Sequence, residues 1–111
     1  MADRVHVLVV DDDEELLEIV CFALRTRGYR VSEARTPAGA RRLVDDEQPD
    51  FILCDDQTFL TEIASDYPDT IRILMWGSFI DEWATLLASG AVRSVLRKPF
   101  ELGQLLACMT D

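Results

Sequence analysis

Apolar residues along the chain follow two different periods, and segments of each period alternate. Near-continuous apolar runs occupy 7–10, 51–54 and 71–76. Runs of this length predict strands that are buried on both faces, as in a parallel sheet covered by helices. Two further segments, 29–34 and 92–96, alternate apolar with polar residues. That pattern is typical of half-exposed strands, so we expect these two at the edges of the sheet.

The segments between these strands show helical spacing. The first, 14–27, has one apolar face formed by Leu17, Val20, Cys21 and Leu24, and Gly28 is placed to end it. Thr36 and Pro37 predict the N-cap and first residue of a second helix, which should stop before Pro49. Further helices are expected at 59–67, 80–90 and 101–109, with these residues facing inward: Phe59, Leu60, Ile63, Ala64, Ile80, Ala84, Leu87, Ala88, Leu102, Leu105 and Leu106.

Strands and helices in strict alternation predict one doubly wound α/β domain over residues 1–111, with five parallel strands. If the two alternating strands are the edges, the order 2-1-3-4-5 also satisfies right-handed crossovers. The first and third strands are then neighbours. Ligands of such sheets bind outside the carboxyl ends of the strands, where the strand order reverses.

Acidic residues stand at that predicted position. Asp11 and Asp12 follow the first strand and Asp55 follows the third, so all three should converge, with Lys98 beyond the fifth strand able to reach them. Two carboxylates about 4 Å apart repel by roughly 4 kcal/mol at an effective dielectric constant of about 20, which favours a bound cation. Mg²⁺ suits carboxylate ligands. In the alternative, the acids cap helices, Asp13 in particular, and Lys98 is a solvated surface residue.

Composition narrows the function classes. The formal net charge is −10, from 21 acidic and 11 basic residues, which argues against direct binding of nucleic acid by this domain. No apolar run reaches the roughly 18 residues of a membrane span, and no signal-peptide pattern is present, which predicts a cytoplasmic protein. The chain has no nucleophile elbow or glycine-rich phosphate loop, so we do not expect an enzyme.

Cysteine and histidine usage points to structural roles. Cys21, Cys54 and Cys108 are odd in number, widely spaced and set in apolar contexts, which predicts buried free thiols rather than disulfides or a metal site. His6, the single histidine, is at the start of the first strand, where a packed position is the more natural interpretation than a role as phosphodonor.

Five pieces of the chain, in this order, resemble the receiver domain of the response regulators of two-component signalling: 8–12, 49–55, 71–74, 90–91 and 98–100. The resemblance covers essentially the whole chain and implies a flavodoxin-like fold. It implies that Asp55 accepts a phosphoryl group from a histidine kinase or phosphotransfer protein. It also implies that Asp11, Asp12 and Asp55 hold Mg²⁺ with the backbone carbonyl of Gln57, and that Lys98 contacts the phosphoryl oxygens.

Three departures from the family pattern leave two interpretations open. Trp76 stands where the family has a threonine or serine hydroxyl, Val95 replaces an aromatic switch residue, and the segment between Asp55 and Trp76 is short, with a reduced third helix region. In the first interpretation the domain is a phosphoacceptor that signals by another route. In the second it is a pseudo-receiver, a protein-interaction module that is not phosphorylated.

The sequence also leaves two alternatives for the surface through which the domain passes on its signal. Trp83 and Leu86 belong to the predicted fourth helix and stand off its expected inward face. They either expose apolar surface for a downstream protein partner or a second copy of the chain, or at least one of them is buried. The kinase, the output and any longer parent protein are not identified by the sequence.

Overall fold

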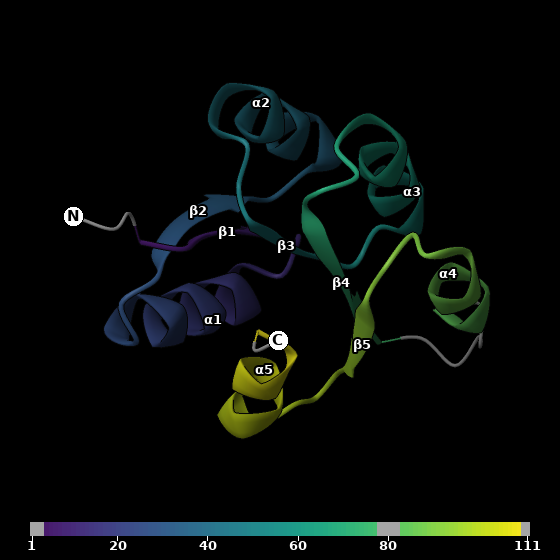
Figure 1. Cartoon of the computed structure of the whole chain (residues 1–111). Coiled ribbons are helices and arrows are strands. Elements are labelled where there is room, and N and C mark those ends of the chain that lie inside the picture. The colour runs from purple at the N-terminus through teal and green to yellow at the C-terminus, as the bar shows by residue number, and fades with distance from the viewer. Residues whose placement is uncertain (1–3, 78–82, 110–111) are drawn as a thin grey trace.

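The strand and helix alternation predicted from the sequence is the observed architecture (Figure 1). A computed structural model describes residues 4–77 and 83–109 of the chain. In chain order the elements are β1 (His6–Val10), α1 (Glu14–Thr26), β2 (Arg30–Ala34), α2 (Pro37–Glu47), β3 (Phe51–Cys54), α3 (Gln57–Asp66), β4 (Ile71–Trp76), α4 (Trp83–Ser89), β5 (Ser94–Arg97) and α5 (Leu102–Cys108).

The strands form one parallel sheet in the order β2-β1-β3-β4-β5, which confirms the predicted order and the two edge strands. Val10 of β1 is level with Cys54 of β3, and Cys54 is level with Leu74 of β4. The residues that follow β1 and β3 therefore leave the sheet at the same height. This register brings the acids after the two strands to one place.

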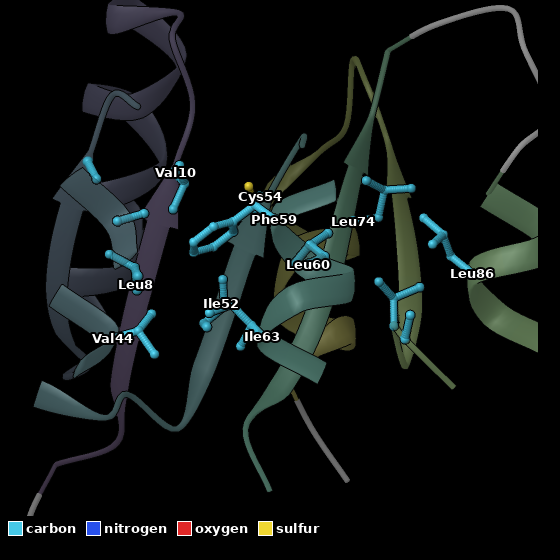
Figure 2. Close-up of a cluster of buried hydrophobic side chains, with 14 of the residues drawn as sticks. Leu8, Val10, Val44, Ile52, Cys54, Phe59, Leu60, Ile63, Leu74 and Leu86 are labelled. Carbon is cyan, nitrogen blue, oxygen red and sulfur yellow. The ribbon is translucent and has the colours of Figure 1, made fainter. Parts of the chain in front are cut away.

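Two apolar cores lie on opposite faces of the sheet, with α2, α3 and α4 over one face and α1 and α5 over the other (Figure 1). Successive strand residues alternate between the cores, so Leu8 and Val10 pack in one and Val7 and Val9 in the other. Figure 2 shows the core beneath α2, α3 and α4. Because both faces are covered, the central strands are apolar at every position except His6 of β1 and Arg72 of β4, which explains the near-continuous runs in the sequence.

Most helix starts and stops follow the local signals. The side chain of Asp13 accepts hydrogen bonds from the backbone N–H groups of Glu15 and Leu16, so this acid is the N-cap of α1. Thr36 caps α2 in the same way, ahead of Pro37. Gly28 follows α1 with a φ of 89°, a conformation that glycine adopts without steric cost.

The predicted inward face of α4 is wrong. It included Ala84, Leu87 and Ala88, yet all three are exposed, and Leu86 is the buried residue of the helix, at 9% exposure. Trp83, one turn earlier, is half-buried and packs against the same core. The inward face therefore runs through 83 and 86, so Leu86 offers no interaction surface. The predicted start of this helix at Ile80 lies outside the described residues.

Two smaller predictions have mixed outcomes. Leu105 is buried under α5 as expected, but Leu102 is 37% exposed because it opens the helix beyond the edge of the core. Cys21, Cys54 and Cys108 are free thiols, and the first two are buried.

Within the described residues, no helix is both long and apolar enough to cross a membrane.

Arg72 is the residue of β4 that the apolar pattern did not explain. Its side chain is buried, and its guanidinium donates hydrogen bonds to the backbone carbonyls of Ala91 at 2.7 Å, Thr70 at 2.6 Å and Tyr67 at 3.1 Å. Burial lowers the pKa of Arg72. The side chain thus ties the connection before β4 to the connection after α4.

Candidate functional site

Three carboxylates converge at the carboxyl ends of β1 and β3. Asp11 and Asp12 follow β1, Asp55 follows β3, and one ligand oxygen from each lies within 4.8 Å of the others. The level register of Val10 and Cys54 explains this convergence, which the sequence predicted. The donor set consists of carboxylate oxygens, which is the chemistry that Mg²⁺ prefers, so these residues fit that ion.

The three acids differ in burial and in how firmly they are held. Asp11 is 1% exposed, whereas Asp12 and Asp55 are open to solvent. One oxygen of Asp11, Oδ1, accepts a hydrogen bond from the backbone N–H of Asp13 at 2.9 Å. Asp11 is therefore a fixed buried group, and Asp55 is the accessible acid of the site.

Lys98 reaches the acids from the end of β5. Its Nζ lies 2.6 Å from Oδ2 of Asp11 and 3.7 Å from Oδ2 of Asp55. Its backbone N–H donates to the carbonyl of Trp76 at 2.6 Å, which extends the pairing of β4 and β5 to the lysine. The shorter of the two ion pairs is thus made with Asp11 and not with Asp55.

The pKa of Asp55 is raised. The side chain is 34% exposed, and the burial of its remaining surface is the largest cause. The negative charge of Asp11 adds to this shift, while Lys98 acts in the opposite direction. A carboxylate in this position is destabilised in its charged form, and a cation placed among the acids would relieve that cost. The electrostatics of the site therefore favour a bound cation.

Gln57 is the fourth predicted metal ligand, through its backbone carbonyl. It is the first residue of α3, directly after the N-cap Asp56, and the hydroxyl of Thr61 donates to its carbonyl at 3.0 Å. Carbonyls in a helix point along its axis toward the C-terminus. This carbonyl accepts one hydrogen bond within α3, and its role as a metal ligand stays a prediction.

Trp76, at the end of β4, was expected at the position where the family has a threonine or serine, but its side chain points elsewhere. The Trp76 side chain is 6% exposed and packs in the core under α2, α3 and α4, on the same face as Leu74. Gly77 is the residue that faces Lys98, because a Cβ atom added to it would lie 3.3 Å from Lys98 Cδ. Sequence reasoning missed Gly77, although the two-residue period of the strand was a usable signal. Neither residue carries a hydroxyl group.

Val95 and Trp83 border one surface groove between α4 and β5. Val95 pairs in register with Leu74 and is half-buried. The groove has a volume of about 410 Å³ and is lined by Trp76, Trp83, Leu87, Arg93, Ser94, Val95 and Arg97. Of the two residues considered for an interaction surface, Trp83 therefore reaches the surface and Leu86 does not.

His6 is distant from this chemistry, as the sequence suggested. It begins β1, at the opposite end of the strand from the acids, and its side chain is buried. Its Nε2 lies 2.8 Å from the hydroxyl oxygen of Ser32, which itself donates to Glu47 at 2.7 Å. His6 thus has a packed, hydrogen-bonded position between β1, β2 and α2.

Comparison with known proteins identifies the fold and the family. The family model of the response regulator receiver domain matches residues 7–110. The chain belongs to this family. Receiver domains are signalling modules, and their acidic pocket in general binds Mg²⁺.

Relatives and solved structures agree with this assignment. The receiver domain is 34% identical to the transcriptional regulatory protein PrrA of Mycobacterium leprae, over 92% of this chain and 47% of that protein. It is 31% identical to the sensor kinase CckA of Brucella abortus, over 89% of this chain and 11% of the kinase. The signal receiver domain of an HD domain-containing protein from Pseudomonas fluorescens superposes with a TM-score of 0.90 at 26% identity, over 98% of this chain and 86% of that one. The chain spans about half the length of PrrA.

Proposed function

We propose that this receiver domain accepts a phosphoryl group on Asp55, with Mg²⁺ held by Asp11, Asp12 and Asp55. The donor is a histidine kinase or a phosphotransfer protein, and the output is a contact with a downstream protein or with a second copy of the chain. The observation that carries the proposal is the meeting of three carboxylates and the only lysine at the carboxyl ends of neighbouring strands. The net charge of −10 favours a protein as the partner over nucleic acid.

Each side chain of the site has a separate role in this proposal. An oxygen of Asp55 attacks phosphorus, the N–P bond of the donor phosphohistidine breaks, and its electron pair stays on the imidazole nitrogen. When bound, Mg²⁺ supplies positive charge that balances the acids and the phosphoryl oxygens. Lys98 is a compact positive charge on a flexible stem, and its Nζ needs to move little from its 3.7 Å distance to Asp55 to contact the incoming group.

Specific features favour the pseudo-receiver as the second candidate. The residue that faces Lys98 is a glycine, so no hydroxyl stands beside the acceptor at that position. Val95 provides no aromatic ring, and α3 begins two residues after Asp55, which engages the Gln57 carbonyl. In this candidate function the fold serves protein contacts alone and Asp55 is never modified.

Intact mass spectrometry separates the two functions. The full chain is incubated with Mg²⁺ and a small phosphodonor such as acetyl phosphate, and we expect a mass increase of one phosphoryl group. Asp55→Asn should abolish the gain. Asp56→Asn is the matched control, because asparagine also caps helices well and the neighbouring acceptor stays intact. An unmodified wild-type chain under these conditions would support the pseudo-receiver.

A further inference from the structure

The outer face of α1 carries two exposed apolar side chains that the acidic site does not use. Ile19 and Phe22 are 60% and 69% exposed, the highest values among the large apolar residues that the structure describes. They stand three positions apart, so they share one face of the helix, opposite the buried face that includes Leu17 and Val20. Adjacent exposed apolar residues of this size can mark a contact with another protein.

Acidic residues frame these two side chains. Glu15 and Glu18 stand four positions before Ile19 and Phe22, which places all four on the same face of α1, and both acids are exposed. Neither carboxylate makes an ion pair with any residue that the structure describes. We call these four residues the α1 patch. The chemistry of the patch fits a partner surface that is apolar and positively charged.

The groove between α4 and β5 has this complementary chemistry. Its walls include the apolar side chains of Trp83, Leu87 and Val95, and Leu87 is 37% exposed. Arg97 lines the same groove, is exposed, and has no ion-pair partner in the described part of the chain. The volume of about 410 Å³ is in the range of small-molecule pockets, so the groove has room for an aromatic ring.

The patch and the groove of one molecule cannot meet. α1 packs against β1 and β2, whereas α4 packs against β5, so the two helices lie at opposite edges of the sheet and on opposite faces of it (Figure 1). A contact between these two surfaces must therefore join two copies of the chain.

We propose that the α1 patch of one copy docks into the α4–β5 groove of a second copy. Phe22 is the apolar anchor in the groove, and Arg97 pairs with the acids of the patch. The contact joins two different surfaces, so it is head-to-tail, and each added copy leaves one patch and one groove free for further growth. The inference names the partner in the output of the proposed function and rests on that function for its role in signalling, but the contact requires neither Mg²⁺ nor phosphorylation of Asp55.

Sedimentation velocity of the full chain measures the association. A contact with few anchors belongs to the weak, transient class of interfaces, so the wild type is studied at concentrations up to about 1 mM. Its sedimentation coefficient should rise with concentration. A wild-type chain that stays monomeric over this range overturns the proposal.

Two variants that each disable one surface test the head-to-tail geometry. Phe22→Gln removes the anchor and Leu87→Gln alters the groove, and both positions are exposed. Each variant alone should associate at least about tenfold more weakly than the wild type. An equal mixture should form a dimer that grows no further, because one variant supplies an intact groove and the other an intact patch. A mixture that stays monomeric, or either variant alone associating like the wild type, overturns the contact.

Charge reversal tests the electrostatic part of the contact. Arg97→Glu should weaken association at least about tenfold, because like charges would then face each other. Arg42→Glu is the matched control, since it makes the same charge change at an exposed position of α2. Equal effects of the two reversals would reduce the result to net charge and overturn the proposal. If Leu87→Gln fails to fold, Arg97→Glu takes its place in the mixture.

Leu102→Gln is the matched control for the loss of an exposed apolar side chain. Leu102 is on α5 outside the groove, and its exposure of 37% equals that of Leu87. The association of this variant should match that of the wild type. A loss equal to that in Leu87→Gln would place the contact elsewhere and overturn the assignment to the groove.

The phosphorylation experiment distinguishes this inference from the proposed function. If association follows the expected pattern while no chain gains a phosphoryl mass, the contact stands and the phosphoacceptor function fails. If the chain gains the mass but does not associate in either form, the contact is overturned and the phosphoacceptor function stands.

Discussion

Arg72 provides a strict test of how the connections around β4 are held. The prediction is that Arg72→Met destabilises the domain, although methionine is the more natural residue for a buried strand. The arginine is 8% exposed and has backbone carbonyls as its acceptors: Ala91, Thr70, Tyr67, Pro68 and Gly90. Substitution removes the donor and leaves these carbonyls to find other partners.

The expected magnitude follows from the geometry. Bonds to Ala91, Thr70 and Tyr67 have lengths of 2.7, 2.6 and 3.1 Å. A hydrogen bond from a charged donor contributes about 1.5 kcal/mol net, so these three together contribute about 4.5 kcal/mol. A buried methionine side chain returns about 1.5 kcal/mol through the hydrophobic effect. The free energy of unfolding should therefore fall by about 3 kcal/mol.

Equilibrium urea unfolding, followed by circular dichroism, measures this change. Arg42→Met is the matched control, because Arg42 is an exposed residue of α2, and surface substitutions usually stay within about 0.5 kcal/mol. If Arg72→Met were as stable as this control, the carbonyl bonds would contribute nothing net, and our account of the two connections would be refuted.

Three further predictions address the helix phase, the histidine and the acid cluster. Leu86→Ala should lower the free energy of unfolding by about 2–4 kcal/mol, and Leu87→Ala should lower it by less than about 1 kcal/mol. Equal losses in urea unfolding would contradict the observation that α4 packs on the core through Leu86. Burial lowers the pKa of His6 from its ordinary value of 6.5, so the stability that the neutral ring contributes is present above that value and is lost as pH falls below it. In His6→Gln, the free energy of unfolding should therefore fall less steeply on the acid side of its pH profile. Identical pH profiles in the variant and the wild type would refute this. The pKa of Asp55 is raised, so its charged form weakens the native state as pH rises above the ordinary value of 3.8. Asp55→Asn should therefore raise the midpoint of urea unfolding at pH 7. A lower midpoint would contradict the repulsion between Asp55 and the other acids.

The strand order and the acid cluster could be predicted because they depend on local patterns. Continuous and alternating apolar runs distinguish buried from edge strands, and the order that follows brings Asp11 and Asp55 together. The face of α4 that packs on the core is harder to predict, because a helix of seven residues has few repeats of the apolar pattern. Trp83 and Leu86 are both apolar, as is Leu87, so the pattern allowed either face.

Other features could not be inferred from the chain alone. The partners of Arg72 are backbone carbonyls that the fold brings near, and the residues that supply them carry no sequence signal for this role. The close approach of Lys98 to Gly77 likewise depends on how β5 pairs with β4. These contacts arise from tertiary structure, so they become visible when the sheet is assembled.

The direct join between β3 and α3 has a consequence for conformational entropy. Two residues, Asp55 and Asp56, separate the strand from the helix, and Asp56 already bonds the backbone N–H of Phe59, whose side chain is buried. The backbone of Asp55 therefore loses its freedom when the chain folds, not when a ligand arrives. Little ordering remains to oppose binding, but a rigid frame also adapts poorly to ions of other sizes. We therefore expect the cluster to discriminate between Mg²⁺ and the larger Ca²⁺ more sharply than a loop-borne site would.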